Sequence, residues 1–323
     1  MNREWVSLAA DWLLVALRTA QAAGAAIMEV YARDFAVDYK ADESPLTEAD
    51  HASHAIILEH LRATGLPVLS EESESIPYDM RRTWTRYWLV DPLDGTKEFI
   101  KRNGDFTVNI ALIESGRPVL GVVHLPAHDE TYWGVDGIGA CLVAPTERFH
   151  SMESVELPFS TQWKKHRDFF HSMETFWADF PLNGKSCRAL APRSLGSGPL
   201  RVVASRSHGT QDTDDFTARL EQAGRPVEFM ARGSALKLCM VAAGEAHVYP
   251  RLAPTMEWDT AAAQAVVEAT GGRVMVYDEA AQHAVAAQGL PALFSAAPLR
   301  YNRENMLNPW FVVVHPALEG LHE

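Results

Sequence analysis

Cysteine and long apolar runs are both scarce in this chain. The three cysteines, Cys141, Cys187 and Cys239, are an odd number with no Cys-x-x-Cys spacing. This pattern argues against a disulfide framework and against a zinc site. The apolar positions near the N-terminus are interrupted by Asp11 and Arg18, so we expect neither a signal peptide nor a membrane-spanning helix. A cytoplasmic location is the resulting prediction.

Positive charge is also scarce. The 29 Lys and Arg residues are outnumbered by 42 Asp and Glu residues, and the net charge is −13. No Lys- or Arg-rich run is present, so we expect no sequence-independent binding of nucleic-acid phosphates. A phosphate-bearing substrate would therefore need local cations at its site, most simply bound metal ions.

The most informative stretch runs from Tyr87 to Thr96, where an aromatic and apolar run ends at two carboxylates, a proline and a glycine. Its apolar part, Tyr87 to Val90, predicts a strand that is covered on both faces. Pro92 and Gly95 should break the regular backbone directly afterwards.

The two carboxylates of this stretch, Asp91 and Asp94, should then lie on a short rigid turn. Spaced three apart, they can converge on one point, and the backbone N–H groups of Gly95 and Thr96 can receive an anion. Carboxylates beside an anion site indicate metal-assisted phosphoryl chemistry. Ordinary turn and helix-capping roles are the alternative for Asp91 and Asp94, because Asp is favoured in both.

Other acids occupy similar local settings. Glu71 and Glu72 follow a short apolar strand, and adjacent strands would bring them to the same sheet edge as Asp91; solvent-facing charge is the simpler alternative. Asp50 lies three residues after a Thr at a helix start, and Asp259 lies at the start of another helix. Helix capping alone would explain both of these residues.

The order of predicted elements divides the chain into three parts. Residues 1–144 are predicted to form an α+β domain, in which two helices pack on an antiparallel sheet. This domain is expected to contain the metal site. Residues 145–200 lose the periodic pattern and are predicted to be an insertion or connecting segment. Residues 201–323 read as an α/β domain. Its expected strands are 201–204, 227–230, 246–249 and 273–277, and its expected helices are 212–222, 234–243 and 261–270.

Two ordered motifs resemble one protein family. They are Asp91-Pro92-Leu93-Asp94-Gly95-Thr96 and Trp258-Asp259-Thr260-Ala261-Ala262, the second followed by Gly271-Gly272. Together they resemble the lithium-sensitive, magnesium-dependent phosphatase superfamily that includes inositol monophosphatase and fructose bisphosphatase. Five further segments are similar to its bacterial bisphosphate nucleotidase branch: 40–45, 69–72, 87–113, 205–208 and 233–237. The segment between residues 145 and 200 departs from the family pattern.

The resemblance implies a layered αβαβα fold, with the site at the junction of the two domains. It implies two or three Mg²⁺ ions, held by Glu71, Asp91, the Leu93 carbonyl, Asp94 and Asp259. Oxygen ligands without His or Cys do favour Mg²⁺ over zinc.

The resemblance also assigns the remaining site residues. Thr96 and Asp50, with Glu72 nearby, would orient and deprotonate the attacking water. The amides of Gly95 and Thr96 would hold the phosphate that is removed. Contacts to a nucleotide would come from His208, Ser234, Lys237 and Arg251.

The expected reaction is hydrolysis of 3′(2′)-phosphoadenosine 5′-phosphate to AMP and phosphate, in sulfur metabolism. Our hypothesis is that Lys237 and Arg251 hold the 5′-phosphate while His208 lies against the adenine. One alternative is a phosphatase of the same superfamily that acts on inositol phosphate or a sugar bisphosphate. Another is a non-catalytic nucleotide-binding scaffold. The resemblance also implies possible peripheral association with the inner face of the plasma membrane, whereas no nucleic-acid partner is expected.

Overall fold

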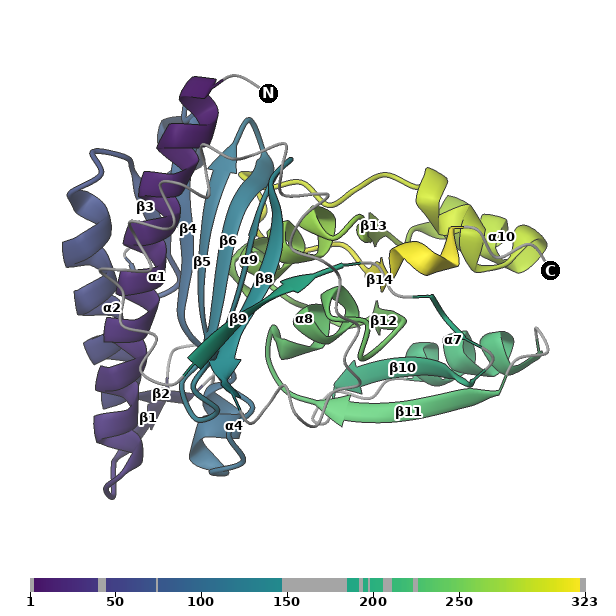
Figure 1. Ribbon diagram of the computed structural model, residues 1–323, viewed down its shortest axis with the longest axis horizontal. Helices are drawn as coiled ribbons and strands as arrows, with labels where there is room; N and C mark the ends of the chain where they lie inside the picture. Colours follow the sequence, from purple (N-terminus) through teal and green to yellow (C-terminus); the bar gives the residue numbers. More distant parts are fainter. Residues whose placement is uncertain are drawn as a thin grey trace.

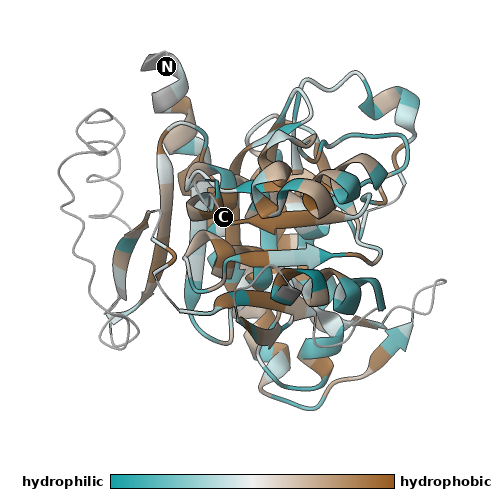
Figure 2. Ribbon diagram, turned by 90° about the vertical axis from the view of Figure 1, so that its right-hand side faces the viewer, coloured by the Kyte–Doolittle hydropathy of each residue, from teal (hydrophilic) through white to brown (hydrophobic). Residues whose placement is uncertain are grey.

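The computed structural model describes residues 3–39, 45–73, 75–146, 185–191, 194–196, 198–205, 211–222 and 226–319. Within these residues, helices and sheets alternate in five layers (Figure 1). The predicted αβαβα architecture is therefore confirmed. Apolar residues concentrate on the inner strands, and hydrophilic residues are more frequent on the outer helices (Figure 2).

The first layer consists of α1 (Arg3–Tyr31) and α2 (Glu48–Arg62), which pack together on one face of a sheet (Figure 1). The α1 stretch from Ser7 to Tyr31 is long and apolar enough to cross a membrane by length and composition. Its apolar stripe, which includes Leu13 and Leu17, is nevertheless buried in the core against this sheet. The observed packing is that of a core helix, because such a stripe at helical spacing can bury only one face.

The second layer is a seven-stranded sheet with the order β3-β4-β5-β6-β7-β8-β9. Its strands are β3 (Val68–Ser70), β4 (Arg86–Asp94), β5 (Thr107–Glu114), β6 (Arg117–Leu125), β7 (Glu130–Val135), β8 (Gly139–Pro145) and β9 (Lys185–Leu190). Only the β3–β4 pair is parallel. Trp88 and Val90 belong to the core under α1, and Tyr87 and Leu89 belong to the core on the opposite face. This confirms the prediction of a strand covered on both faces.

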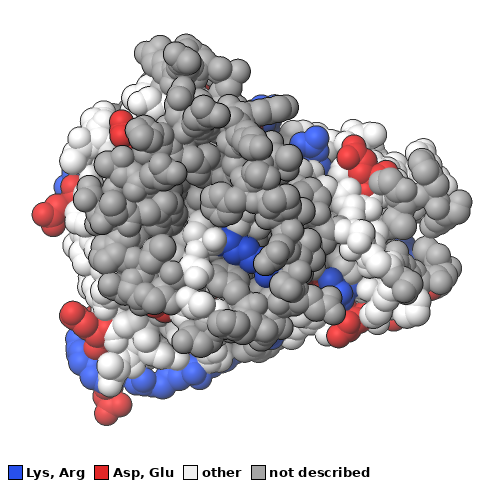
Figure 3. All heavy atoms as spheres, in the orientation of Figure 1, with Lys and Arg blue, Asp and Glu red and all other residues white. Residues whose placement is uncertain are grey.

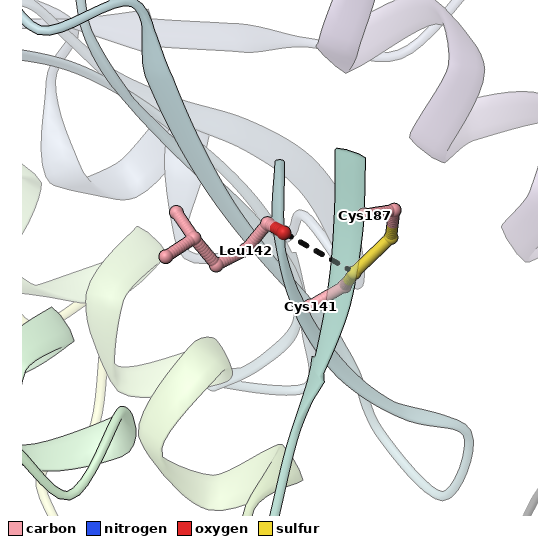
Figure 4. Close-up of a disulfide and its surroundings, with 3 residues drawn as sticks. All are labelled: Cys141, Leu142 and Cys187. Carbon is pink, nitrogen blue, oxygen red and sulfur yellow. Dashed lines mark hydrogen bonds between the residues drawn. A yellow bond between two sulfur atoms is a disulfide. The ribbon is translucent and has the colours of Figure 1, made fainter. Parts of the chain in front are cut away.

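A disulfide joins the last two strands of this sheet, between Cys141 on β8 and Cys187 on β9 (Figure 4). The expectation from the cysteine count, that no disulfide would form, is wrong for this pair. The two cysteines are 46 positions apart in the sequence, and the pairing of β8 with β9 brings their Cα atoms to 6.4 Å. Local spacing cannot reveal such a contact. β9 also shows that part of the predicted connecting segment belongs to this sheet; residues 147–184 of that segment lie outside the described residues.

The third layer contains α8 (Leu236–Ala242) and α9 (Glu257–Ala269), which lie between the two sheets. The fourth is a five-stranded sheet with the order β11-β10-β12-β14-β13. Its strands are β10 (Leu200–Ser205), β11 (Val227–Arg232), β12 (Val248–Arg251), β13 (Arg273–Val276) and β14 (Phe311–Val314). α7 (Gln211–Gln222) and α10 (Glu279–Gln288) cover its outer face (Figure 1).

Short elements complete the described chain. They are β1 (Val37–Tyr39), β2 (Pro45–Thr47), α3 (Tyr78–Arg81), α4 (Thr96–Ile100), and the 3-10 helices η2 (Leu290–Ser295) and η3 (Pro316–Leu318). The predicted helices and strands of the second half are found, with ends that differ by a few residues. β14 and α10 were not predicted. On the face seen in Figure 3, described Lys and Arg side chains lie along the lower left edge, where Asp and Glu side chains also lie, and others are scattered over the rest of this face.

Candidate active site

The parallel pairing of β3 with β4 brings the first two acids together. Ser70 is the register partner of Val90, so the next residues, Glu71 and Asp91, emerge at the same edge of the sheet. The Glu71 N–H donates to the Val90 carbonyl at 3.1 Å, which fixes the chain at this point. The expectation that adjacent strands would gather these acids is therefore met by the observed register.

A β-bulge, rather than a turn, positions the second carboxylate of the central motif. β4 continues through Asp94, and its register against β5 shifts between Asp91, opposite Asn109, and Asp94, opposite Thr107. Residues three apart on a regular strand point to opposite faces, but the extra residue of a bulge changes this alternation. Asp91 and Asp94 consequently line the same cavity. The predicted rigid turn is therefore wrong, because β4 continues past Pro92 to Asp94.

The regular strand then ends at Gly95, whose φ of 91° lies in the left-handed region. An added Cβ there would also meet the Asp105 carbonyl at 3.2 Å. Glycine is suited to this position because it alone adopts such a φ without cost. α4 begins at the next residue, Thr96.

Asp94 connects the two halves of the chain. Its Oδ2 atom accepts hydrogen bonds from the Ala235 N–H at 2.6 Å, from Asn109 Nδ2 at 3.3 Å and from Thr107 Oγ1 at 3.4 Å. Burial raises the pKa of Asp94 to about 6, although the Lys237 ammonium and the Ala235 amide act in the opposite direction. These contacts fix Asp94 between β5 and the residue that precedes α8.

Asp259 reaches the site from α9. It is the third residue of the helix and accepts a hydrogen bond from the Met256 N–H at 2.9 Å, so the N-cap position belongs to Met256. The alternative interpretation of Asp259 as the N-cap is therefore wrong by three positions, although the residue does help to cap the helix. α9 lies directly on the seven-stranded sheet: a Cβ on Gly121 would come within 2.0 Å of the Ala262 carbonyl oxygen. Only glycine permits this approach.

The carboxylates influence one another strongly. Burial raises the pKa of Asp91 well above its ordinary value, and the nearby Glu71, Asp94 and Asp259 carboxylates raise it further. The pKa of Asp259 is raised in the same way, first by burial and then by Asp94. Buried acids of this kind remain partly protonated unless a cation neutralises them.

A cavity of about 260 Å³ brings most of the predicted residues together. Its walls include Glu71, Asp91, Leu93, Asp94, Gly95, Thr96, Ser234, Lys237, Arg251 and Asp259. Among the described residues that line the cavity, the possible metal donors are hard oxygen atoms and none is His or Cys, which fits Mg²⁺. Within the described part of the chain, no three His, Cys, Asp or Glu side chains already stand close enough to hold a metal ion between them. An ion would therefore draw these carboxylates together.

The predicted water-activating pair is adjacent in the structure. Thr96 Oγ1 lies 3.4 Å from Asp50 Oδ1 and 3.4 Å from the Leu93 carbonyl oxygen. Asp50 is 2% exposed, and its other carboxylate oxygen accepts from the Thr47 N–H and hydroxyl, both at 2.7 Å. Capping of α2 and contact with Thr96 thus use different oxygens of the same side chain. Glu72 is not among the residues that line the cavity, and its charge acts on His54.

Three of the four predicted nucleotide contacts line the cavity, and the fourth, His208, lies outside the described residues. The Lys237 Nζ atom donates to the Ser234 carbonyl at 2.6 Å and lies 5.4 Å from the centre of the Tyr249 ring. Burial lowers the pKa of Lys237 to about 8, and Asp94 opposes this shift. Arg251 is anchored through the Pro254 carbonyl at 2.7 Å.

Several residues that line the cavity were not predicted from the sequence. Glu98 and Tyr249 lie in its wall, and Asp105 accepts the Gly233 N–H at 3.0 Å beside it. Position along the chain offered one signal, since Glu98 closely follows the central motif and Tyr249 lies two residues before Arg251. The negative charges of Glu98 and Asp105 also act on Lys237: they raise its pKa and so partly oppose the lowering that burial causes.

The fold and this site define a phosphatase class, and comparison with known proteins names it: the chain belongs to the inositol monophosphatase family, whose model matches residues 9–297. The family is one of metal-dependent phosphatases, generally with Mg²⁺. The predicted family resemblance is thus confirmed.

Among curated proteins of this family, the chain is similar to several bisphosphate nucleotidases. The chain is 42% identical over 259 residues to the 3′(2′),5′-bisphosphate nucleotidase CysQ of Salmonella typhimurium, covering 79% of this chain and 86% of the relative. It is 38% identical over 298 residues to the CysQ of Escherichia coli K12, covering 91% and 96%.

Solved structures of the same family have a similar fold. The CysQ structure from Bacteroides thetaiotaomicron matches with a TM-score of 0.70 and 39% identity, over 95% of this chain and 97% of that one. An inositol monophosphatase from Anabaena matches with a TM-score of 0.60 at 20% identity, over 97% and 93%, which supports the fold.

Proposed function

We propose that this protein is a Mg²⁺-dependent 3′(2′),5′-bisphosphate nucleotidase, which hydrolyses 3′(2′)-phosphoadenosine 5′-phosphate to AMP and phosphate. The observation that carries this proposal is that one cavity is lined both by the carboxylates of Glu71, Asp91, Asp94 and Asp259 and by the cations Lys237 and Arg251. The carboxylates suit metal-assisted attack on a phosphate, and the two cations suit a further phosphate on the same substrate. Identity of 38–42% to proteins named for this activity supports the assignment.

The carboxylates and the Leu93 carbonyl would hold two or three Mg²⁺ ions. Mg²⁺ held there would supply a lowered pKa for a water molecule and positive charge beside the phosphate and the leaving oxygen. Thr96 would orient the attacking water through its hydroxyl, and Asp50, 3.4 Å from that hydroxyl, would receive the proton, with Glu72 near this region. The water oxygen bonds to phosphorus, the P–O ester bond breaks, and the leaving ribose oxygen takes up a proton.

The rest of the cavity would position the substrate. The Gly95 and Thr96 amides, at the start of α4, would receive the phosphate that is removed. Lys237 and Arg251 would hold the 5′-phosphate, Ser234 would lie beside the sugar, and His208 would lie against the adenine. This reaction would recycle a by-product of sulfur assimilation in the cytoplasm. A location at the inner face of the membrane is suggested by family resemblance alone.

The test is phosphate release from 3′-phosphoadenosine 5′-phosphate with Mg²⁺, compared with inositol 1-phosphate and fructose 1,6-bisphosphate, each with and without Li⁺. We expect a strong preference for the nucleotide and inhibition by Li⁺. Asp91→Asn, which removes one buried carboxylate, should lower kcat on every substrate by about 100-fold or more, since loss of one electrostatic group at a reacting centre has effects on this order. A preference for inositol phosphate would keep the metal site and overturn the substrate assignment. Absence of turnover on all three would favour a non-catalytic scaffold.

A further inference from the structure

A second cavity, of about 330 Å³, lies further along α9. Thr260 of α9 lines the active-site cavity, whereas Gln264 and Glu268 line this second one. Residues four apart lie on the same face of a helix, one turn after another. The two cavities are therefore separated along one helix face, roughly 12 Å from Thr260 to Glu268 at 1.5 Å per residue, and the second shares no wall residue with the first.

Positive charge dominates the second cavity. Its walls contain three arginines, Arg117, Arg273 and Arg300, and one carboxylate, that of Glu268. Arg117 lies 3.8 Å from Glu268. Among the residues that the structure describes, no hydrogen bond or ion pair of 4 Å or less is recorded for the guanidinium groups of Arg273 and Arg300. A gathering of three arginines in a protein with a net charge of −13 favours an anionic ligand.

The polar wall of this cavity is held in place by buried hydrogen bonds. Gln264, which is 1% exposed, donates to Glu268 Oε1 at 2.8 Å and accepts from the Tyr301 hydroxyl at 2.6 Å. The Tyr301 hydroxyl also lies 3.2 Å from Thr260 Oγ1. Glu268 accepts from Gln264 and lies 3.8 Å from Arg117, and the charge of Arg273 also acts on it, so one carboxylate faces three arginines and a net positive charge is left. These hydrogen bonds hold Gln264 and Glu268 in place before any ligand binds.

The remaining wall is apolar and includes Met275, Phe294 and Leu299. The volume of the cavity lies at the lower end of the range of about 300–1,000 Å³ that is typical of small-molecule sites. The cavity is therefore larger than a bare phosphate ion requires. Arginine forks match phosphate oxygens in pairs, and an apolar wall suits a carbon-containing body. We propose that this cavity is a second binding site, for a small organic phosphate, distinct from the active site and independent of the proposed function.

The test is calorimetric titration of the full-length protein with AMP in EDTA, which removes metal-assisted binding at the active site. We expect the double variant Arg273→Ala/Arg300→Ala to weaken this binding at least 10-fold while leaving kcat for phosphate release unchanged, because neither residue lines the active-site cavity. A matched control is Arg82→Ala, which removes an exposed arginine that pairs with Asp79 at 2.9 Å. This control should bind AMP as the unmodified protein does.

A second variant separates the two cavities. Lys237→Met alters the active-site cavity alone, so AMP binding in EDTA should persist in it and should still depend on Arg273 and Arg300. Complete loss of binding in Lys237→Met would assign all AMP binding to the active site and overturn the proposal. Unchanged binding in the double arginine variant would overturn it as well.

Discussion

Lys237 is the residue whose surroundings say most about substrate choice. Its ammonium group is buried among Asp94, Glu98 and Asp105, it donates to the Ser234 carbonyl, and it lies over the Tyr249 ring. Buried lysines are rare unless they are paired, because the charged form loses its hydration. Here the acids supply that pairing, and the cavity leaves the lysine within reach of a bound anion.

At the residue scale, we predict that Lys237→Met raises KM for 3′-phosphoadenosine 5′-phosphate about 10- to 100-fold, with a much smaller effect on a sugar monophosphate. The reason is the loss of one charge-assisted hydrogen bond to the second phosphate, worth about 1.5–3 kcal/mol. Methionine keeps the apolar stem, so packing against Tyr249 should survive. Steady-state kinetics on both substrates measure the difference, and equal changes in KM for the two would remove the 5′-phosphate assignment.

At the scale of elements, the position of α9 decides whether Asp259 reaches the other acids. Two glycines make its approach to the sheet possible: a Cβ on Gly121 would lie 2.0 Å from the Ala262 carbonyl oxygen, and a Cβ on Gly134 would lie 2.6 Å from the Val266 Cα. Both obstacles are backbone atoms, which cannot move aside like the end of a side chain. The glycines of β6 and β7 therefore help to set the position of Asp259, which lies on α9.

For this element we predict that Gly121→Ala lowers the free energy of unfolding by about 3 kcal/mol, the upper end of the usual cost of overpacking. α9 would have to shift away from β6, so Mg²⁺ affinity should fall as well. Urea unfolding and Mg²⁺ titration by calorimetry are the measurements. Gly198→Ala is the matched control, since nothing lies within 4 Å of its added Cβ, and its stability should change by about 0.5 kcal/mol or less. Equal stability of both variants would contradict the close approach of α9.

The end of the chain also supports α9. Asn308 donates to the Met256 carbonyl at 2.7 Å and to Thr260 Oγ1 at 3.1 Å. Glu257, which is fully buried, accepts from the Asn302 N–H at 2.7 Å and from the Arg303 N–H at 3.1 Å. The segment from Asn302 to Asn308 thus holds the first turn of the helix that presents Asp259.

For the molecule as a whole, the site draws residues from both sheets and from α9, which lies between them, and it concentrates negative charge there. The pKa of Asp94 is raised to about 6, and those of Asp91 and Asp259 are raised well above their ordinary values. A carboxyl group whose pKa is raised on folding binds more protons in the folded state. Its contribution to stability is present below the ordinary pKa, near 4, and is lost as the pH rises through the raised pKa.

We therefore predict that the metal-free protein becomes less stable as the pH rises from about 4 through 6 and beyond, because the clustered carboxyl groups of Asp91, Asp94 and Asp259 lose their protons. Mg²⁺ binding should restore this stability, because a ligand of the folded state stabilises by about 2.7 kcal/mol at 100 times its Kd. The increase in Tm on adding Mg²⁺ should be larger at pH 7.5 than at pH 5, where protonated carboxyls compete with the ion.

Thermal unfolding in EDTA and in excess Mg²⁺ at the two pH values measures this effect. Asp91→Asn serves as the control, since it removes one of the repelling charges and should reduce both the pH dependence and the response to Mg²⁺. A Tm increase of equal size at both pH values would show that the ion binds somewhere other than this cluster.

The family, the order of most elements and the acids that line the cavity could all be predicted from local patterns in the sequence. Asp91 to Thr96 and Trp258 to Ala262 are local patterns, and the strand and helix periodicities around them are local as well, so they can be read without any partner. The expectation that Glu71 and Asp91 meet at one edge of a sheet also followed from two strand patterns close together in the sequence. The domain boundaries and the individual roles of the site residues stay predictions.

Tertiary structure alone decided the features that depend on distant partners. The bulge between Asp91 and Asp94 arises from their pairing with β5, and the Cys141–Cys187 disulfide arises from the pairing of two strands far apart in the chain. The same holds for the second cavity, whose arginines come from β6, β13 and the segment after η2. Periodicity and spacing report what one segment can do, whereas register and burial depend on the element that packs against it.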